Sequence, residues 1–186
     1  MKLSPRYLIL KPWWMMYCWK LDQKAKEKNL HVVSFKTQIP KVFADPDKVH
    51  QVLLNLLGNA LKFTPEDGGI TISFFSDGQM VEVSIKDSGV GISREDQNRL
   101  FQKFGRLDYS YVASATSGGT GLGLFICKSL INLMKGKIWA ESEGLNKGST
   151  FSFSLPAATS EVLKDMGKYT TKLDGKDIKL LEPVVL

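Results

Sequence analysis

The stretch HQVLLNLLGNALKF, residues 50–63, decides the interpretation of this chain. From the residue before this stretch onward, apolar side chains recur at the spacing of one face of an α-helix, and this core stripe consists of Val49, Leu53, Leu56 and Ala60. Asp45 and Pro46 precede it as an N-cap and a first helical residue, and Thr64-Pro65 ends it. The sequence therefore predicts one long helix, from about residue 46 to residue 63, with one face against the core.

A different face of the same helix carries polar groups. Asn55 and Asn59 are four residues apart, Phe63 follows four residues later, and Lys62 lies beside them. Burying an amide among leucines costs about 1–3 kcal/mol unless it is hydrogen-bonded. Two interpretations stay open: the amides cap neighbouring backbone, or their carbonyl oxygens hold Mg²⁺ while Lys62 contacts phosphate. Mg²⁺ is adequately held by few protein oxygens together with phosphates and waters.

Strands, turns and a second helix surround this element. Alternating β-branched and apolar residues predict strands over residues 7–10, 31–38, 70–75, 80–86, 137–141 and 149–155. Residues 12–29 and 122–134 are predicted to be helical, and residues 93–120 are typical of a long loop that acts as a lid. The predicted fold class is α/β, an α+β two-layer sandwich whose mixed, largely antiparallel sheet has helices on one face.

Two glycine-rich segments flank the predicted lid. Asp87-Ser88-Gly89-Val90-Gly91-Ile92 directly follows a strand, so it is either a plain turn or a place where the backbone approaches a purine while Asp87 accepts from its amine. Ser117-Gly118-Gly119-Thr120-Gly121-Leu122-Gly123-Leu124 opens a helix, so it is either a hinge or a phosphate cradle. It is not a Walker A loop, because no Gly-Lys-Ser/Thr closes it.

The bulk properties of the chain exclude several classes of protein. Its 186 residues, 43% hydrophobic, suit one globular domain, expected at residues 24–156 between an apolar N-terminal segment (1–23) and a polar tail (157–186). The net charge of +6 is spread over the sequence instead of forming a stripe, so nucleic-acid binding is not expected. The apolar run at residues 7–19 is shorter than the ~20 residues of a membrane span, so no membrane contact by this chain is expected either. Cys18 and Cys127 are expected to be buried or incidental thiols of a reducing cytoplasm.

In this order and spacing, the motifs resemble the ATP-binding domain of sensor histidine kinases. That domain belongs to the GHKL ATPases, which share the Bergerat fold with gyrase, heat-shock chaperone 90 and mismatch-repair ATPases. The resemblance implies that ATP and Mg²⁺ bind here, with the metal on Asn59 and Asn55. The residues it assigns to the nucleotide are Asn55, Asn59, Lys62, Phe63, Asp87, Gly89, Gly91, Ile92, Phe104, Gly119, Thr120, Gly121, Leu122, Gly123, Leu124 and Thr150.

The same resemblance implies further roles around the lid. Phe101 and Phe104 match the family's Phe-x-x-Phe motif, and Arg106 stands where the family often has an arginine that reaches the γ-phosphate. The catalytic set is therefore expected to be Asn55, Asn59, Lys62 and Arg106. In Gly148-Ser149-Thr150, a hydroxyl is expected to close the adenine pocket, and Thr150 is the predicted residue.

The identity of residue 55 separates the branches of this superfamily. Hydrolysing members that resemble gyrase have a glutamate at this position as the base for water, and an amide cannot take that proton. We therefore expect ATP to be bound and transferred to a histidine, not rapidly hydrolysed. Neither His31 nor His50 is followed by an acidic residue, so the acceptor is expected on a dimerisation domain, upstream or on a separate chain, with a response regulator as the indirect partner. The alternatives are a regulatory ATP-binding module without phosphotransfer and a GHKL-type ATPase. Either way a cytoplasmic location is expected, free or within a membrane-anchored receptor.

Overall fold

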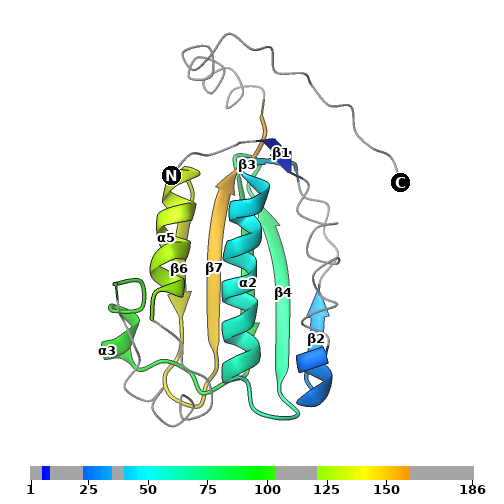
Figure 1. Cartoon of the computed structure of the whole chain (residues 1–186), viewed down its shortest axis with the longest axis vertical. Coiled ribbons are helices and arrows are strands. Elements are labelled where there is room, and N and C mark those ends of the chain that lie inside the picture. Colours follow the sequence, from blue (N-terminus) through cyan, green and yellow to red (C-terminus); the bar gives the residue numbers. More distant parts are fainter. Residues whose placement is uncertain (1–5, 9–22, 35–39, 104–120, 160–186) are drawn as a thin grey trace.

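The computed structural model describes residues 6–8, 23–34, 40–103 and 121–159 (Figure 1). In chain order its elements are β1 (Arg6–Leu8), β2 (His31–Ser34), β3 (Val42–Ala44), α2 (Pro46–Phe63), β4 (Gly69–Ser76), β5 (Met80–Asp87), α3 (Arg94–Gln97), α5 (Gly123–Leu133), β6 (Lys137–Glu141) and β7 (Ser149–Pro156). Residues 23–27 are also helical and lead into β2.

The strands form one large sheet and one small one. The large sheet has the order β2-β4-β5-β7-β6, in which only the β2–β4 pair is parallel. The small sheet is the antiparallel pair β1–β3. Figure 1 shows α2 and α5 side by side on one face of the large sheet. The predicted two-layer α/β fold, with a mixed and largely antiparallel sheet, is confirmed.

Helix α2 begins and ends where its sequence predicts. Asp45 is the N-cap, and its carboxylate accepts from the backbone N–H groups of Asp47 and Lys48 at 3.0 and 3.3 Å. At the other end the hydroxyl of Thr64 donates to the carbonyl of Ala60 at 2.6 Å. Satisfying these terminal groups stabilises the helix at both ends. The buried stripe is broader than predicted and comprises Val49, Val52, Leu56, Leu57, Ala60 and Leu61, while Leu53 is half-buried against it.

The core lies between α2, α5 and the inner face of the sheet. Because side chains alternate along a strand, every second residue of β4, β5 and β7 reaches this layer. These inner residues are Ile70, Ile72, Val81, Val83, Ile85, Phe151, Phe153 and Leu155, and α5 adds Cys127, Leu130 and Ile131. This packing holds both helices against the sheet, with the C-terminal end of α2 next to the segment that follows β5 and the start of α5 next to Asn55.

Several predicted elements differ from the observed ones or fall outside the described residues. Of the strands predicted over residues 7–10 and 31–38, the structure describes Arg6–Leu8 and His31–Ser34, and the helix predicted over residues 12–29 is described only from residue 23. The predicted lid is not all loop, because α3 forms at its start and Leu100 is buried in the core, 3% exposed. Residues 104–120 of the lid and the tail from residue 160 lie outside the described residues. Among the described residues, no helix combines the length and the apolar character that a membrane crossing needs.

Candidate functional site

Asn55 lies on α2 where this helix meets the first residue of α5. Its Nδ2 atom donates to the carbonyl of Gln51 at 3.0 Å, which fixes the orientation of the amide. Its Oδ1 atom lies against α5, and a Cβ atom on Gly123 would approach it to 2.7 Å. The interpretation in which the amides cap neighbouring backbone therefore holds for the Asn55 nitrogen alone. The Asn55 oxygen lies between the two helices.

The remaining polar face of α2 continues toward the C-terminal end of the helix. Asn59 is half-buried, and its amide makes no hydrogen bond within the part of the chain that the structure describes. Lys62 is also half-buried, and its ammonium lies 5.1 Å from the centre of the Phe63 ring. Asn55, Asn59 and Lys62 thus form one row along α2, two amides followed by a cation, as the helical spacing predicts.

Asp87 is the last residue of β5 and is almost completely buried, 4% exposed. One carboxylate oxygen accepts from the backbone N–H of Gly89 at 2.8 Å, and the other accepts from the hydroxyl of Ser149 at 2.6 Å. A buried carboxylate requires such donors. These two bonds aim its remaining lone pairs, so Asp87 can accept from one further donor, such as an amine of a ligand.

The segment after Asp87 is packed against the end of α2. The carbonyl of Phe63 accepts from the N–H of Val90 at 3.3 Å. A Cβ atom on Gly89 would approach that carbonyl oxygen to 2.5 Å, closer than real Cβ contacts, so only glycine fits there. The aspartate, the glycine turn and the C-terminal end of α2 therefore form one rigid unit.

A second loop, residues 142–148, holds the same segment from the other side. The N–H of Asn146 donates to the carbonyl of Val90 at 2.7 Å, and the Ser142 hydroxyl accepts from the N–H of Ile92 at 3.0 Å. Gly91 has a φ of +69°, and a side chain on it would collide with the carbonyl of Gly144. The backbone around the buried aspartate is therefore fixed on two sides.

The N-terminal end of α5 is suited to bind an anion. Its N-cap residue, Leu122, makes no side-chain cap hydrogen bond, and the first turn contains no acidic residue. The first N–H groups of a helix lack partners within the helix and carry partial positive charge. Gly121 precedes them with a φ of +69°, which lets the chain turn into the helix. Residues 121–124 of the predicted phosphate cradle therefore open a helix, and its role in binding phosphate stays a prediction.

Most of the predicted site residues that the structure describes lie close together, but the predicted hydroxyl of Thr150 does not lie with them. By strand alternation Thr150 lies on the open face of the sheet, opposite Lys86 and Glu141, whereas Ser149 contacts Asp87. Ser149, one residue earlier, is therefore the hydroxyl that the sequence analysis missed. The predicted residues outside the described part of the chain are Phe104, Arg106, Gly119 and Thr120.

The donor set fits a magnesium–nucleotide complex better than an all-protein metal site. Within the described residues, no three His, Cys, Asp or Glu side chains are grouped as a protein-only site would require. The Oδ1 atom of Asn55 and the unpaired amide of Asn59 supply neutral oxygens, and Mg²⁺ bound by nucleotides takes few protein ligands. The segment that follows the buried carboxylate of Asp87 lies at one end of this row, beside Phe63, and the N-terminal end of α5 lies at the other, beside Asn55.

Comparison of the sequence with known proteins agrees with this geometry. Residues 44–159 match the family described as "Histidine kinase-, DNA gyrase B-, and HSP90-like ATPase". The chain is 34% identical over 158 residues to the adaptive-response sensory kinase SasA of Synechococcus elongatus, covering 84% of this chain and 40% of that protein. It is 38% identical over 170 residues to the signal transduction histidine-protein kinase BarA of Escherichia coli, covering 88% and 18%. The chain thus spans less than half the length of these curated relatives.

The chain also resembles solved structures in its fold. The catalytic domain of histidine kinase ThkA superposes with a TM-score of 0.70 at 29% identity, over 83% of this chain and 99% of that one. Full-length ShkA in complex with AMPPNP superposes with a TM-score of 0.73 at 30% identity, over 86% and 32%. AMPPNP resembles ATP, so the second structure is a nucleotide complex of a similar domain.

Proposed function

The chain belongs to the histidine kinase-, DNA gyrase B- and HSP90-like ATPase family, and we propose that it is the ATP-binding catalytic domain of a sensor histidine kinase that passes the γ-phosphate of ATP to a histidine outside this chain. ATP binding follows from the family. The acceptor, the role of each residue and the use of Mg²⁺ are parts of the proposal. The relatives named above are sensor kinases, which supports it.

The observation that carries the proposal is the amide at position 55. Hydrolysis needs a base beside the attacking water, and an uncharged amide cannot act as that base at neutral pH. The Asn55 nitrogen donates to Gln51 and its oxygen lies against Gly123. Such a group orients phosphate and metal and leaves the γ-phosphate for another nucleophile.

The remaining residues would bind and orient ATP. Asp87 accepts from the adenine amine, and the N–H groups at the start of α5 face the phosphates. Asn55 and Asn59 would hold Mg²⁺, which neutralises charge on the phosphate oxygens when it is bound. Lys62 adds a positive charge to the same row. Catalysis of phosphoryl transfer is mainly positioning and charge neutralisation, so this set is sufficient for the ATP side of the reaction.

The acceptor side of the reaction lies elsewhere. His31 is exposed on β2 and is followed by Val32, and His50 lies within α2 and is followed by Gln51. In the proposed step a ring nitrogen of the acceptor histidine bonds to the γ-phosphorus while the bond to the β–γ bridging oxygen breaks. ADP leaves, and the imidazole loses its ring proton to solvent. A histidine-bearing dimerisation domain is therefore the proposed partner, and a response regulator would receive the phosphate afterwards.

Labelled ATP tests the proposal. The chain is incubated with [γ-³²P]ATP and Mg²⁺, alone and together with a separate dimerisation domain taken from a relative such as BarA. We expect slow release of phosphate, no label on this chain, and an acid-labile, base-stable label on the added domain. Rapid turnover by the chain alone would identify a GHKL-type ATPase instead, and an acid-stable label would identify a serine or threonine kinase.

Asn59→Ala tests the part of the proposal that concerns the metal. For the wild type, Mg–ATP at 100 times its Kd should add about 2.7 kcal/mol of stability. The variant should retain the fold of the nucleotide-free protein and lose most of this Mg²⁺-dependent gain. An equal rise in melting temperature for both proteins would remove Asn59 from the site.

A further inference from the structure

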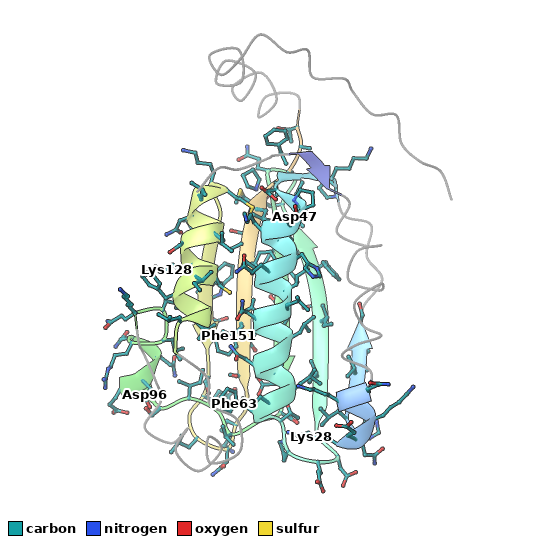
Figure 2. All side chains as sticks on the ribbon, viewed as in Figure 1. Lys28, Asp47, Phe63, Asp96, Lys128 and Phe151 are labelled. Atoms are coloured by element: carbon teal, nitrogen blue, oxygen red, sulfur yellow. The ribbon has the colours of Figure 1, made fainter. Side chains whose placement is uncertain are left out.

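The ammonium group of Lys28 is bonded to the end of α2 that carries the nucleotide-site residues. Its Nζ atom donates to the carbonyls of Leu61, Lys62 and Thr64 at 3.0, 3.2 and 2.9 Å. All three donors of the ammonium therefore have carbonyl partners. Figure 2 shows Lys28 and Phe63 at the same end of α2, although Lys28 comes from the segment before β2.

These bonds complete the C-terminal end of α2. The last carbonyls of a helix have no partner within it and carry partial negative charge, so a cation there is favourable. Lys28 donates to three carbonyls at this end of the helix. The carbonyl of Phe63, which lies among them in the sequence, accepts instead from the N–H of Val90 at 3.3 Å. The end of α2 is thus shared between one lysine and the glycine turn that follows Asp87.

The backbone around Lys28 holds its side chain in place. Asn29 adopts a φ of +51°, and the N–H of Leu30 bonds to the carbonyl of Ala25 at 2.8 Å, which ends the helical stretch of residues 23–27. The Asn29 amide donates to the carboxylate of Asp67 at 2.6 Å, and the N–H of Asp67 donates to the carbonyl of Lys28 at 3.0 Å. Lys28 is therefore anchored to the turn between α2 and β4 by its backbone as well as its side chain.

The first residue of β4, directly after this turn, bonds to the segment after Asp87. The N–H of Ser88 donates to the carbonyl of Gly69 at 3.0 Å, and the Ser88 hydroxyl accepts from the N–H of Gly69 at 2.9 Å. Two routes of hydrogen bonds therefore connect Lys28 to the adenine end of the site, one through Phe63 and one through Gly69.

We propose that Lys28 is a positioning residue for nucleotide binding: its ammonium holds the last turn of α2 so that Phe63 and Val90 keep the Asp87 turn in its binding geometry. This role rests on the proposed nucleotide site, and it adds a residue that supports the site without contacting the nucleotide. It also makes the helical segment that enters the domain, residues 23–27, part of the structure that supports the site. A shift of that segment would loosen the adenine end of the site.

Lys28→Met tests the inference because methionine keeps the length of the stem and removes the charge and the donors. ATP affinity is measured by calorimetry with Mg²⁺, well below the melting temperature of every variant. We expect Kd to rise on the order of tenfold, within the range over which coupled sites influence each other. The Val90 amide should also exchange with solvent faster relative to global unfolding. Lys28→Arg retains the charge and several donors and should bind within about threefold of the wild type.

Two controls separate positioning from general stability. Lys24→Met changes an exposed lysine of the same helical segment and should leave Kd unchanged. Val81→Ala removes buried volume at the far end of β5, so it should lower the melting temperature while leaving Kd and Val90 exchange as in the wild type. If Lys28→Met does not fold, Lys28→Gln, whose amide keeps two donors, takes its place with a smaller expected rise in Kd.

The outcomes distinguish this inference from the proposed function. A wild-type chain that does not bind Mg–ATP would overturn the proposed function itself. A wild type that binds, together with a folded Lys28→Met (or Lys28→Gln) variant of the same Kd, would overturn only the positioning role. A Kd that rises equally in Lys28→Met and Val81→Ala would show that Lys28 acts through overall stability, which also overturns it.

Discussion

Replacing Asp87 by asparagine should weaken ATP binding while leaving the protein folded. The carboxylate accepts from Gly89 and Ser149 at 2.8 and 2.6 Å. In the variant, the amide oxygen can keep the bond from Gly89, and the amide nitrogen can donate to the Ser149 oxygen, whose hydroxyl rotates to suit. Each polar atom retains a partner, so the free energy of unfolding should fall by only about 1 kcal/mol.

The loss of affinity is expected to be larger. A hydrogen bond to a charged group contributes about 1.5–3 kcal/mol. The variant removes the charge of Asp87 and places an NH₂ group where a carboxylate oxygen was, so a ligand amine meets a donor or, at best, a neutral acceptor. At about 1.4 kcal/mol for each factor of ten, Kd for ATP should rise about 10- to 150-fold.

Calorimetry with two nucleotides isolates the interaction between Asp87 and the amine. Purine riboside triphosphate has a hydrogen in place of the 6-amino group of ATP, so it should bind the wild type more weakly and lose little further affinity in Asp87→Asn. Asp77→Asn is the matched control, because Asp77 also accepts two backbone N–H bonds, from Gln79 and Met80, but lies in the β4–β5 turn far from the site. Equal losses for both nucleotides, or no loss for ATP, would refute the assignment of Asp87 to the adenine amine.

Three further changes test other parts of the structure. Gly123→Ala should raise Kd for Mg–ATP by about tenfold or more, as displaced groups around a metal site do, because the new Cβ would lie 2.7 Å from Oδ1 of Asn55; unchanged binding in calorimetry would contradict this. Gly58→Ala should raise the free energy of unfolding in urea by about 0.5–1 kcal/mol, because Gly58 lies within α2 with open space where a Cβ would be, and a lower value would count against it. Burial raises the pKa of Cys127 from 9.0 to about 12, so the folded state favours the thiol and loses about 4 kcal/mol of stability between pH 9 and pH 12. A Cys127→Ala variant should lack this part of the pH dependence. If the wild type and the variant lost the same free energy of unfolding between pH 9 and pH 12, Cys127 would not be its source.

Helices α2 and α5 and the central strands were predictable because several local signals agree. For α2 the aspartate N-cap, the proline after it, the apolar stripe and the Thr64-Pro65 ending all point to the same bounds, and Pro46–Phe63 is what the structure has. Strands β4, β5 and β7 differ from their predicted ranges by no more than a residue at either end, because alternation over about eight residues is a strong pattern. The helix α3 was missed because a four-residue helix is too short to show periodicity.

The hydroxyl next to Asp87 could not be chosen from the motif alone. Ser149 and Thr150 are adjacent, and side chains of adjacent strand residues point to opposite faces of a sheet. The choice depends on the pairing of Asp87 with Ser149 across β5 and β7, which places both on the face toward the helices. The apolar residues of the same strand could have decided between the two hydroxyls. Side chains alternate along the strand, so burial of Phe151, Phe153 and Leu155 on one face also places Ser149 on that face and Thr150 on the other.

The contact between Lys28 and α2 lies beyond any local pattern. The lysine and its carbonyl partners are 33 to 36 residues apart, and a lysine after a polar helical segment looks like any exposed cation. What brings them together is the parallel pairing of β2 with β4, in which His31 lies opposite Gly69. That register sets residue 28, three residues before β2, beside the turn that ends α2. The pairing of one edge strand therefore brings Lys28 to the end of the asparagine-bearing helix, and the proposed support of the turn after Asp87 depends on that pairing.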